Sequence, residues 1–279
     1  MLIQKLELYS KLTPTKIALV YNGKPISYLK YYSTIARIAN QWKIYSMPTN
    51  TVAIVFIKNI IDNWTATIAL QSLGLITICV TKLADIQDLK IKNISCIVIC
   101  QFNQAELKNT LGNISNYKII DYPDEIYSED VINDIKIEYE VSNTGGHILY
   151  TSGTTGKFKK LKYDNSNEDD SLKALSVVNG ITGKTVWNIT NFGLWTGAGY
   201  KRPRTVWSQG GTVVIDQRTN YIEHLGDFNV TNVNFVPRLA IEAIEKYKEL
   251  NLKKNKFSLK IGGGPMSYEL INAVNYFFN

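Results

Sequence analysis

The stretch "LYTSGTTGKFKKLKYD", residues 149–164, is the part of the sequence on which the prediction of the fold depends. Its first half alternates small hydroxyl residues with glycines, its second half carries four lysines, and a strand-like run, 147–150, leads into it. After a strand, glycines let an anion approach the backbone N–H groups, hydroxyls add donors, and lysine adds a charge-assisted contact. The pattern therefore predicts a phosphate-binding loop.

The general nucleotide P-loop, G-x-x-x-x-G-K-[S/T], does not fit this stretch. With Gly156 and Lys157 as its G-K pair, Thr151 would stand where the first glycine is needed, and Phe158 would replace the residue that binds magnesium. A flexible Ser/Thr/Gly surface loop is the alternative interpretation.

Outward from the loop, apolar runs of strand length alternate with segments of helical spacing, which favours an α/β fold with stacked, mostly parallel sheets flanked by helices. The predicted strands are 51–57, 75–80, 95–101, 117–123, 185–190, 211–216, 231–237 and 257–261. The predicted helices are 60–73, 103–111, 167–179, 219–228, 239–247 and a last one that contains 270–278. A polar segment predicts a division into two α/β subdomains, 1–143 and 144–279, the second of which opens with the loop.

The composition is that of a globular protein, with 45% hydrophobic and 20% charged residues. The net charge is +7, but the lysines form no dense basic stripe, so no nucleic-acid partner is expected. The three cysteines lie in strand-like runs without a ligand pattern, which predicts buried, reduced thiols and no metal site. No signal peptide is visible, and the longest apolar run, 65–80, is interrupted by polar residues. We therefore expect a cytoplasmic protein without a membrane span.

Residues 150–160, "YTSGTTGKFKK", resemble the signature phosphate loop of the adenylate-forming enzymes, which include acyl-CoA synthetases, nonribosomal peptide adenylation domains and luciferases. The family pattern is roughly Y-T-S-G-[ST]-T-G-x-P-K-G. Residues 150–156 match it in full and Lys159 falls on its lysine, whereas Phe158 replaces the proline and Lys160 the last glycine. The resemblance implies that the phosphates of ATP, with Mg²⁺ shared between them, are bound by Thr151, Ser152, Gly153, Thr154, Thr155, Gly156 and Lys159.

Further segments follow in family order and extend the resemblance over nearly the whole chain: 13–42, 52–80, 226–237 and 259–270. The last of these is similar to the family's G-G-A-P-L-S-x-E-L turn, which lies against adenine. The resemblance therefore implies an adenine face at Gly263, Gly264 and Pro265. It also implies an acid pocket near Asn191, Phe192, Trp195 and Phe235, although a place in the plain core is the alternative for the aromatic residues.

The chain ends just after the "GGGP" turn, before the family's Y-G-x-T-E segment, its ribose-binding aspartate, its hinge and its C-terminal lid. The resemblance thus covers the N-terminal portion of the adenylate-forming fold, with the C-terminal lid domain absent. Because the family's catalytic lysine belongs to that lid, no catalytic residue is assigned.

The resemblance implies ATP-dependent activation of a carboxylic acid as an acyl-adenylate, followed by transfer to a thiol of coenzyme A or carrier-protein pantetheine. The isolated chain is expected to be inactive or weakly active, and a partner chain would supply the missing part. The alternatives are a lidless nucleotide- or acyl-adenylate-binding module, a pseudo-enzyme without turnover, and a chance match of the loop. The apolar stripe from Leu270 to Phe278 predicts an exposed surface that a partner would cover.

Overall fold

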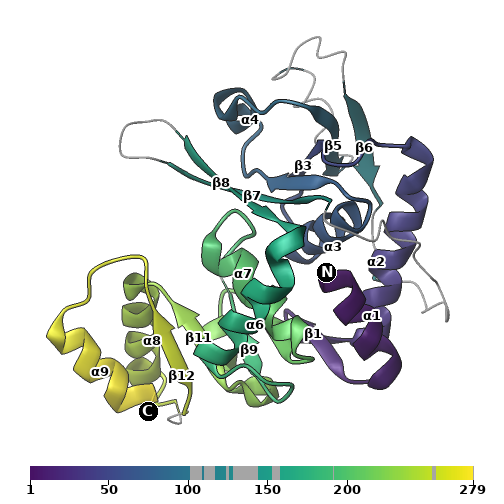
Figure 1. Ribbon diagram of the computed structural model, residues 1–279. Coiled ribbons are helices and arrows are strands. Elements are labelled where there is room, and N and C mark those ends of the chain that lie inside the picture. Colours follow the sequence, from purple (N-terminus) through teal and green to yellow (C-terminus); the bar gives the residue numbers. More distant parts are fainter. Residues whose placement is uncertain are drawn as a thin grey trace.

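The computed structural model describes residues 1–100, 109, 117–123, 126–127, 144–152, 158–190, 192–252 and 256–278. In these residues the chain forms two six-stranded, mostly parallel sheets with helices packed around them (Figure 1). The predicted fold class is therefore confirmed. No helix in the described ranges is both long enough and apolar enough to cross a membrane.

The first sheet holds the strands that lead to the predicted phosphate loop. Its order is β6-β5-β3-β4-β7-β8, and only the β7–β8 pair is antiparallel. All five residues of the inner strand β3 are buried, as its continuous apolar sequence predicts. The strands are β3 (Val52–Phe56), β4 (Ile76–Cys79), β5 (Ile94–Cys100), β6 (Lys118–Tyr122), β7 (Gly146–Ser152) and β8 (Phe158–Asp164).

The second sheet has the order β12-β11-β9-β10-β1-β2, in which only β1 and β2 pair antiparallel. Its strands are β1 (Ile17–Tyr21), β2 (Lys24–Ser27), β9 (Val186–Asn188), β10 (Thr212–Ile215), β11 (Asn232–Phe235) and β12 (Ser258–Ile261). Each sheet takes strands from both sides of residue 143, because β1 pairs with β10 and β7 pairs with β4. The two sheets thus do not follow the division at 143, which stays a prediction about the sequence.

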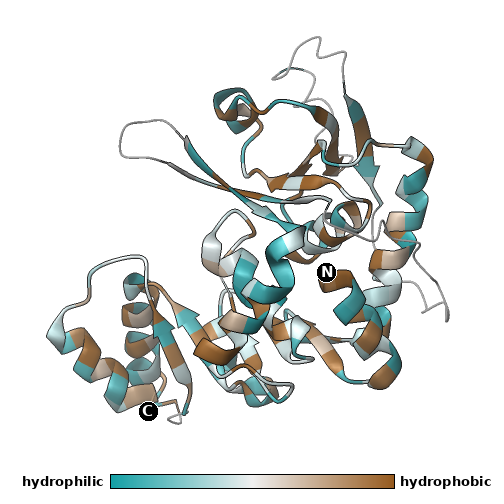
Figure 2. Cartoon of the chain, viewed as in Figure 1, coloured by the Kyte–Doolittle hydropathy of each residue, from teal (hydrophilic) through white to brown (hydrophobic). Residues whose placement is uncertain are grey.

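Helices cover both sheets and fill the space between them. They are α1 (Leu2–Leu12), α2 (Tyr28–Trp42), α3 (Ile60–Ser72), α4 (Ala84–Leu89), α6 (Glu168–Asn179), α7 (Gly197–Ser208), α8 (Pro237–Glu249) and α9 (Tyr268–Phe278). Single 3-10 turns are η1 (Lys43–Tyr45), η3 (Asn165–Asn167), η4 (Tyr221–His224) and η5 (Asp227–Asn229). Figure 2 shows the hydrophobic colour on β3 and β5 and hydrophilic residues in the first turns of α6.

The layer between the sheets is one aromatic-rich core. The Trp207 ring of α7 lies 5.1 Å from Tyr31 of α2 and 5.1 Å from Trp64 of α3. Its Nε1 donates a 2.9 Å hydrogen bond to the backbone oxygen of Ala18 in β1. Because α3 is buried on nearly all sides, it packs against the first sheet and α7 at once. This packing holds α7, which lines the site described below.

One predicted element differs in the structure, one observed strand was not predicted, and another predicted element lies almost wholly outside the described residues. The predicted helix 219–228 is two separate 3-10 turns, since Phe228 adopts a left-handed conformation with φ 60° that a helix cannot contain. Strand β8 was not predicted, because its lysine-rich sequence reads as a polar loop rather than as an alternating strand. The predicted helix 103–111 lies almost wholly outside the described residues.

The stripe of the last helix, which was predicted to form an exposed surface, is covered in part within the chain. Val274 and Phe278 of α9 are buried, and the Phe278 ring packs 5.0 Å from Tyr247, 6.2 Å from Phe257 and 6.3 Å from Phe235. The aromatic residues of α8, β11 and the segment before β12 therefore cover the Phe278 end of the stripe, whereas Leu270, Ala273 and Phe277 are partly buried.

Candidate functional site

The predicted phosphate loop connects two strands that pair directly with each other. Strand β7 runs through Ser152, β8 begins at Phe158, and Thr151 stands opposite Lys159 in the antiparallel register. The hairpin projects from the first sheet (Figure 1). Four predicted loop residues lie outside the described residues: Gly153, Thr154, Thr155 and Gly156. For Thr151 and Ser152 the structure describes the backbone but not the side chains.

Lys159 is the loop residue whose side chain the structure describes. It is exposed on β8, and no carboxylate of the described residues forms an ion pair with it. Side chains alternate along a strand, so Lys159 shares a face with Tyr163, roughly 13 Å further along at 3.3 Å per residue. Tyr163 lies at the edge of α7. Among the described residues the lysine therefore has no ion-pair partner, and it lies on the side of the hairpin that faces α7.

A cavity of about 610 Å³ opens where β11 and β12 end and α7 begins. Carboxyl ends of parallel strands are where α/β folds place their ligands. The lining brings together three predicted site residues, Phe192 and Phe235 of the acid pocket and Gly263 of the adenine face. Gly263 has φ +87°, a left-handed turn that glycine adopts without strain.

Other predicted site residues lie apart from this cavity. Trp195 is 37% exposed, and its ring covers Gly193, where an added Cβ would come within 2.2 Å of the indole. Gly264 and Pro265 are exposed in the turn beyond the lining. Asn191 lies outside the described residues.

Three cations in the cavity lining were missed at the sequence level. Lys201 and Arg202 come from α7 and Lys260 from β12, and the described lining contains no aspartate or glutamate. The Arg202 guanidinium carbon lies 5.2 Å and the Lys260 Nζ 5.8 Å from the centroid of the Trp187 ring. Burial lowers the pKa of both cations, and the charge of Arg202 lowers that of Lys260 further. The run "GYKRPR", 199–204, is the sequence signal that could have indicated this cluster.

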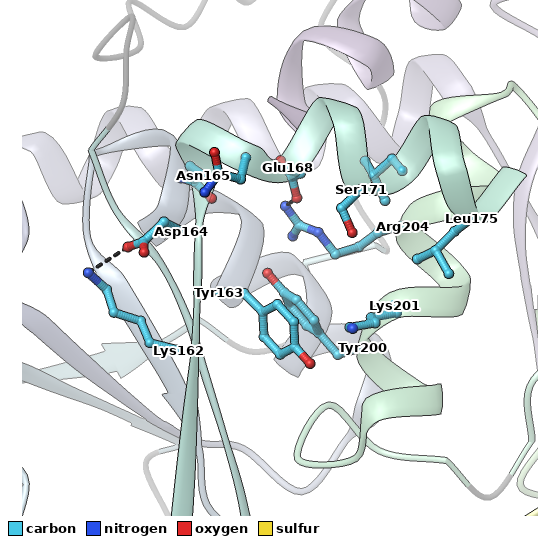
Figure 3. Close-up of a pocket in the computed structure, with 12 residues that line it drawn as sticks. Lys162, Tyr163, Asp164, Asn165, Glu168, Ser171, Leu175, Tyr200, Lys201 and Arg204 are labelled. Carbon is cyan, nitrogen blue, oxygen red and sulfur yellow. Dashed lines mark ion pairs between the residues drawn. The ribbon is translucent and has the colours of Figure 1, made fainter.

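A smaller cavity of about 260 Å³ lies beside the larger one, between β8, α6 and α7 (Figure 3). The two cavities share Leu175 and Lys201 in their linings. The Nζ of Lys201 sits 4.2 Å from the centroid of the Tyr163 ring, a cation–π contact. Lys201 therefore stands between the larger cavity and the strand that carries Lys159.

The inner wall of the smaller cavity is a buried ion pair between Arg204 of α7 and Glu168 of α6. Arg204 Nη1 also donates a 2.7 Å hydrogen bond to Gln71 Oε1, and Glu168 accepts one of 3.1 Å from the Leu2 backbone N–H. Figure 3 shows the carboxylate and the guanidinium turned toward each other. Each charge is thus compensated within the protein, which indicates a structural pair.

His147 is also a core residue. Its ring stacks on Tyr200 at 3.9 Å, its Nδ1 lies 2.8 Å from the Thr77 hydroxyl, and its Nε2 lies 3.1 Å from the Leu194 backbone oxygen. Burial lowers the pKa of His147 to about 3. The imidazole is therefore neutral, with Nε2–H donating to Leu194, and its two ring nitrogens are both engaged.

No family model matches the chain. Among curated proteins the chain is similar to the 2-succinylbenzoate–CoA ligase of Bacillus subtilis (strain 168), with 24% identity over 269 residues. This alignment covers 94% of the chain and 54% of the relative, so the chain spans about half the length of the curated relative it matches.

Two solved structures of O-succinylbenzoate coenzyme A synthetase (MenE) from Bacillus subtilis are also similar. The complex with ATP and magnesium ion has a TM-score of 0.78 at 21% identity, covering 98% of this chain and 57% of that one. The complex with the acyl-adenylate intermediate OSB-AMP has a TM-score of 0.79 at 21% identity, covering 98% and 56%. In sequence and in fold, the chain resembles the N-terminal part of the adenylate-forming enzymes.

Proposed function

We propose that this chain is the nucleotide- and acid-binding part of an enzyme that activates a carboxylic acid as its acyl-adenylate. One observation carries the proposal. The seven-residue signature 150–156, followed by Lys159, joins two paired strands of a chain that has the adenylate-forming fold over 98% of its length. The likeness of the chain to solved adenylate-forming structures supports this interpretation of the loop over a chance match.

The reaction is R-COO⁻ + ATP → R-CO-AMP + pyrophosphate. A carboxylate oxygen attacks the α-phosphorus, the bond to the bridging oxygen of the β-phosphate breaks, and pyrophosphate leaves with the electron pair. Such a step needs positioned reactants and neutralised phosphate charge. Residues 151–156 would supply hydroxyl and backbone donors to the β- and γ-phosphates, and Lys159 would supply a charge-assisted contact. Magnesium, when bound, neutralises part of the phosphate charge.

The larger cavity is where the acid would bind. Its volume of about 610 Å³ lies in the range of small-molecule sites. Phe192 and Phe235 would contact the organic part of the acid, and Gly263 would lie toward the adenine. Asn191, Trp195, Gly264 and Pro265 remain proposed members of the same site. A thiol acceptor, coenzyme A or a carrier-protein pantetheine, belongs to the proposal as the second substrate of the whole enzyme.

Stable acyl-adenylate analogues test this function without requiring turnover. We would titrate the chain with 5′-sulfamoyladenosine and with a series of acyl-sulfamoyladenosines, using calorimetry. At least one acyl group should raise the affinity about tenfold or more, since burying even a few methylene groups contributes over 1.4 kcal/mol. Phe235→Ala removes an aromatic ring from the cavity lining and should reduce the affinity that the acyl group adds. If no acyl group adds affinity, or if no analogue binds, the proposed function is wrong.

A further inference from the structure

One buried side chain connects the two halves of the proposed site. His147 belongs to β7 and lies four residues before Thr151 of the phosphate-loop signature, which is roughly 13 Å along an extended strand. Its Nε2 lies 3.1 Å from the backbone oxygen of Leu194. Leu194 is buried and stands between Phe192 and Thr196, both of which line the larger cavity. The strand that leads to the phosphate loop is thus joined to the wall of the acid cavity through one imidazole.

The cavity wall at Leu194 is a loop between β9 and α7, so its backbone groups need partners outside regular structure. Thr196 supplies some of them, because its hydroxyl donates a 2.9 Å hydrogen bond to the Gly193 oxygen and accepts one of 3.0 Å from the Gly199 N–H. The carbonyl of Leu194 is satisfied by the Nε2–H of His147. Without that donor a buried carbonyl would lose its partner, and this wall of the cavity would be less firmly held.

The His147 ring also fixes the start of α7. It stacks on Tyr200 with 3.9 Å between the ring centroids and 9° between the planes. Tyr200 stacks in turn on Trp64 of α3, at 5.9 Å and 7°. The next two residues of α7, Lys201 and Arg202, line the larger cavity. The stack therefore determines where α7 presents these side chains to the cavity.

Packing alone does not require a histidine at this position. His147 is 0% exposed, and burying an imidazole costs free energy unless its nitrogens form hydrogen bonds. The Thr77 hydroxyl donates to Nδ1 over 2.8 Å, which leaves the ring proton on Nε2, directed at Leu194. A fully satisfied buried network of this kind selects one arrangement of the segments that it joins.

We propose that His147 is a positioning residue, which holds the acid-cavity wall at Leu194 and α7 in register with β7, so that a bound acid meets the nucleotide. The inference rests on the proposed function and adds to it a residue that contacts neither substrate. A wall that is not held in place must be ordered by the ligand itself, and this ordering lowers the affinity for the acyl group.

Substitutions that imitate one ring nitrogen at a time separate positioning from packing. Glutamine can place an amide N–H near the position of Nε2 and still donate to Leu194, whereas asparagine reaches only the position of Nδ1. We would measure by calorimetry how much the best acyl group adds to the affinity of 5′-sulfamoyladenosine. His147→Asn and His147→Leu should reduce this gain about 5- to 10-fold, the effect of a buried carbonyl left without a donor, and His147→Gln should keep most of it. The affinity for MgATP should be the same in all three variants.

A purely structural role predicts another pattern, in which the variants lose stability and keep the acyl gain. Ile78→Val, which shortens a side chain in the separate cluster on the other face of the first sheet, controls for lost core packing and should leave the gain unchanged. If all three His147 variants keep the gain, or if they weaken MgATP as strongly as the acyl analogue, the inference is wrong and the proposed function stands. If no acyl group adds affinity to the wild type, both fail.

The wild-type chain gives a second readout that does not require any variant to fold. The chain has two histidines, so the ring ¹⁵N signals of His147 can be assigned by NMR with a single substitution at His224. The acyl analogue should shift the Nε2 signal of His147, because the acyl group would occupy the cavity beside the Leu194 wall, and unacylated 5′-sulfamoyladenosine should leave it unchanged. An Nε2 signal that does not respond to the acyl group would contradict the inference.

Discussion

Glu168 and Arg204 form an ion pair that is almost completely removed from solvent, with side-chain exposures of 9% and 2%, and it joins the first turn of α6 to α7. The same two side chains reach the N-terminus of α1 through Leu2 and helix α3 through Gln71. Four helices are thus tied together at the wall that separates the core from the smaller cavity.

Breaking this pair from one side should be strongly destabilising. Glu168→Ala leaves the Arg204 charge buried without a carboxylate, so we expect the free energy of unfolding to fall by about 3–5 kcal/mol. Urea denaturation followed by tryptophan fluorescence measures it. Glu242→Ala, which removes the partner of the exposed Arg238, is the matched control and should cost less than about 1 kcal/mol. If both substitutions lower the free energy of unfolding by the same amount, the buried pair contributes no more to stability than the exposed one.

The start of α7 depends on a glycine that no other residue can replace. A Cβ on Gly199 would come within 2.1 Å of the Gly193 backbone oxygen and 2.6 Å of that of Phe192. Gly199→Ala should therefore displace the segment that carries Phe192 and lower the unfolding free energy by about 1–3 kcal/mol. Gly197→Ala, two residues earlier with nothing within 4 Å of its Cβ position, should be neutral or stabilising by about 0.4–1 kcal/mol. Thermal unfolding measures the melting temperature of each variant. Equal melting temperatures for Gly199→Ala and Gly197→Ala would contradict the close backbone contact at Gly199.

Acid should destabilise the protein through His147. Burial lowers its pKa to about 3 in the folded chain, whereas the unfolded value is near 6.5. Below pH 6.5 the unfolded chain therefore binds a proton that the folded chain does not, and the free energy of unfolding should fall by up to about 1.4 kcal/mol per pH unit toward pH 3. His147→Gln removes this titration, so its stability deficit relative to the wild type should shrink between pH 7 and pH 4.5. A deficit that stays constant with pH would contradict the neutral, buried imidazole.

The three thiols should differ in reactivity. Cys79 and Cys96 are buried and burial raises the pKa of each to about 12, whereas Cys100 is only half-buried. The sequence-level expectation of buried core thiols is thus confirmed for the first two and too strong for the third. Because the thiolate is the reacting form, a disulfide reagent at pH 8 should modify Cys100 first, and the other two only at the rate of unfolding. Fast, equal modification of all three in the native protein would contradict their burial.

Local sequence patterns predicted the elements that have a strong local cause. The continuous apolar run 51–57 became β3, and the helical spacing of 60–73 became α3, which is followed by Gly74 with φ +79°. The segment 167–179 became α6 for the same reason. These elements are specified by periodicity and by residues with particular backbone preferences, and both can be recognised in the amino-acid sequence alone.

Features that depend on contacts between residues far apart in the sequence could not be predicted from local patterns. Strand β8 exists because β7 pairs with it, although its own lysine-rich sequence has little strand character. Phe278 of the α9 stripe packs against Tyr247 of α8 and Phe257 before β12, which lie 31 and 21 positions away in the sequence. Arg202 and Lys260 are 58 positions apart in the chain and meet over Trp187 only in the folded sheet.

The candidate site was predicted to different degrees for the same reason. A contiguous loop signature such as 150–156 is visible in the sequence, whereas a cavity wall is assembled from separate elements. Phe192, Phe235 and Gly263 were found through the family resemblance, and Phe235 and Gly263 belong to segments that follow in family order. The cations of the cavity belong to no such motif, which is why they were missed.

The central claim is that the loop between β7 and β8 binds the phosphates of ATP, and calorimetric titration of the chain with MgATP tests it most directly. The comparison is with Thr155→Ala/Lys159→Ala, while Lys184→Ala, which removes an exposed lysine far along the sequence, serves as the control. We expect the wild type and the control to bind MgATP alike, and the double variant to bind about 100-fold more weakly, the loss of two phosphate contacts of which one is charge-assisted. Undiminished binding by the double variant, or no binding by any of the three proteins, would contradict the account.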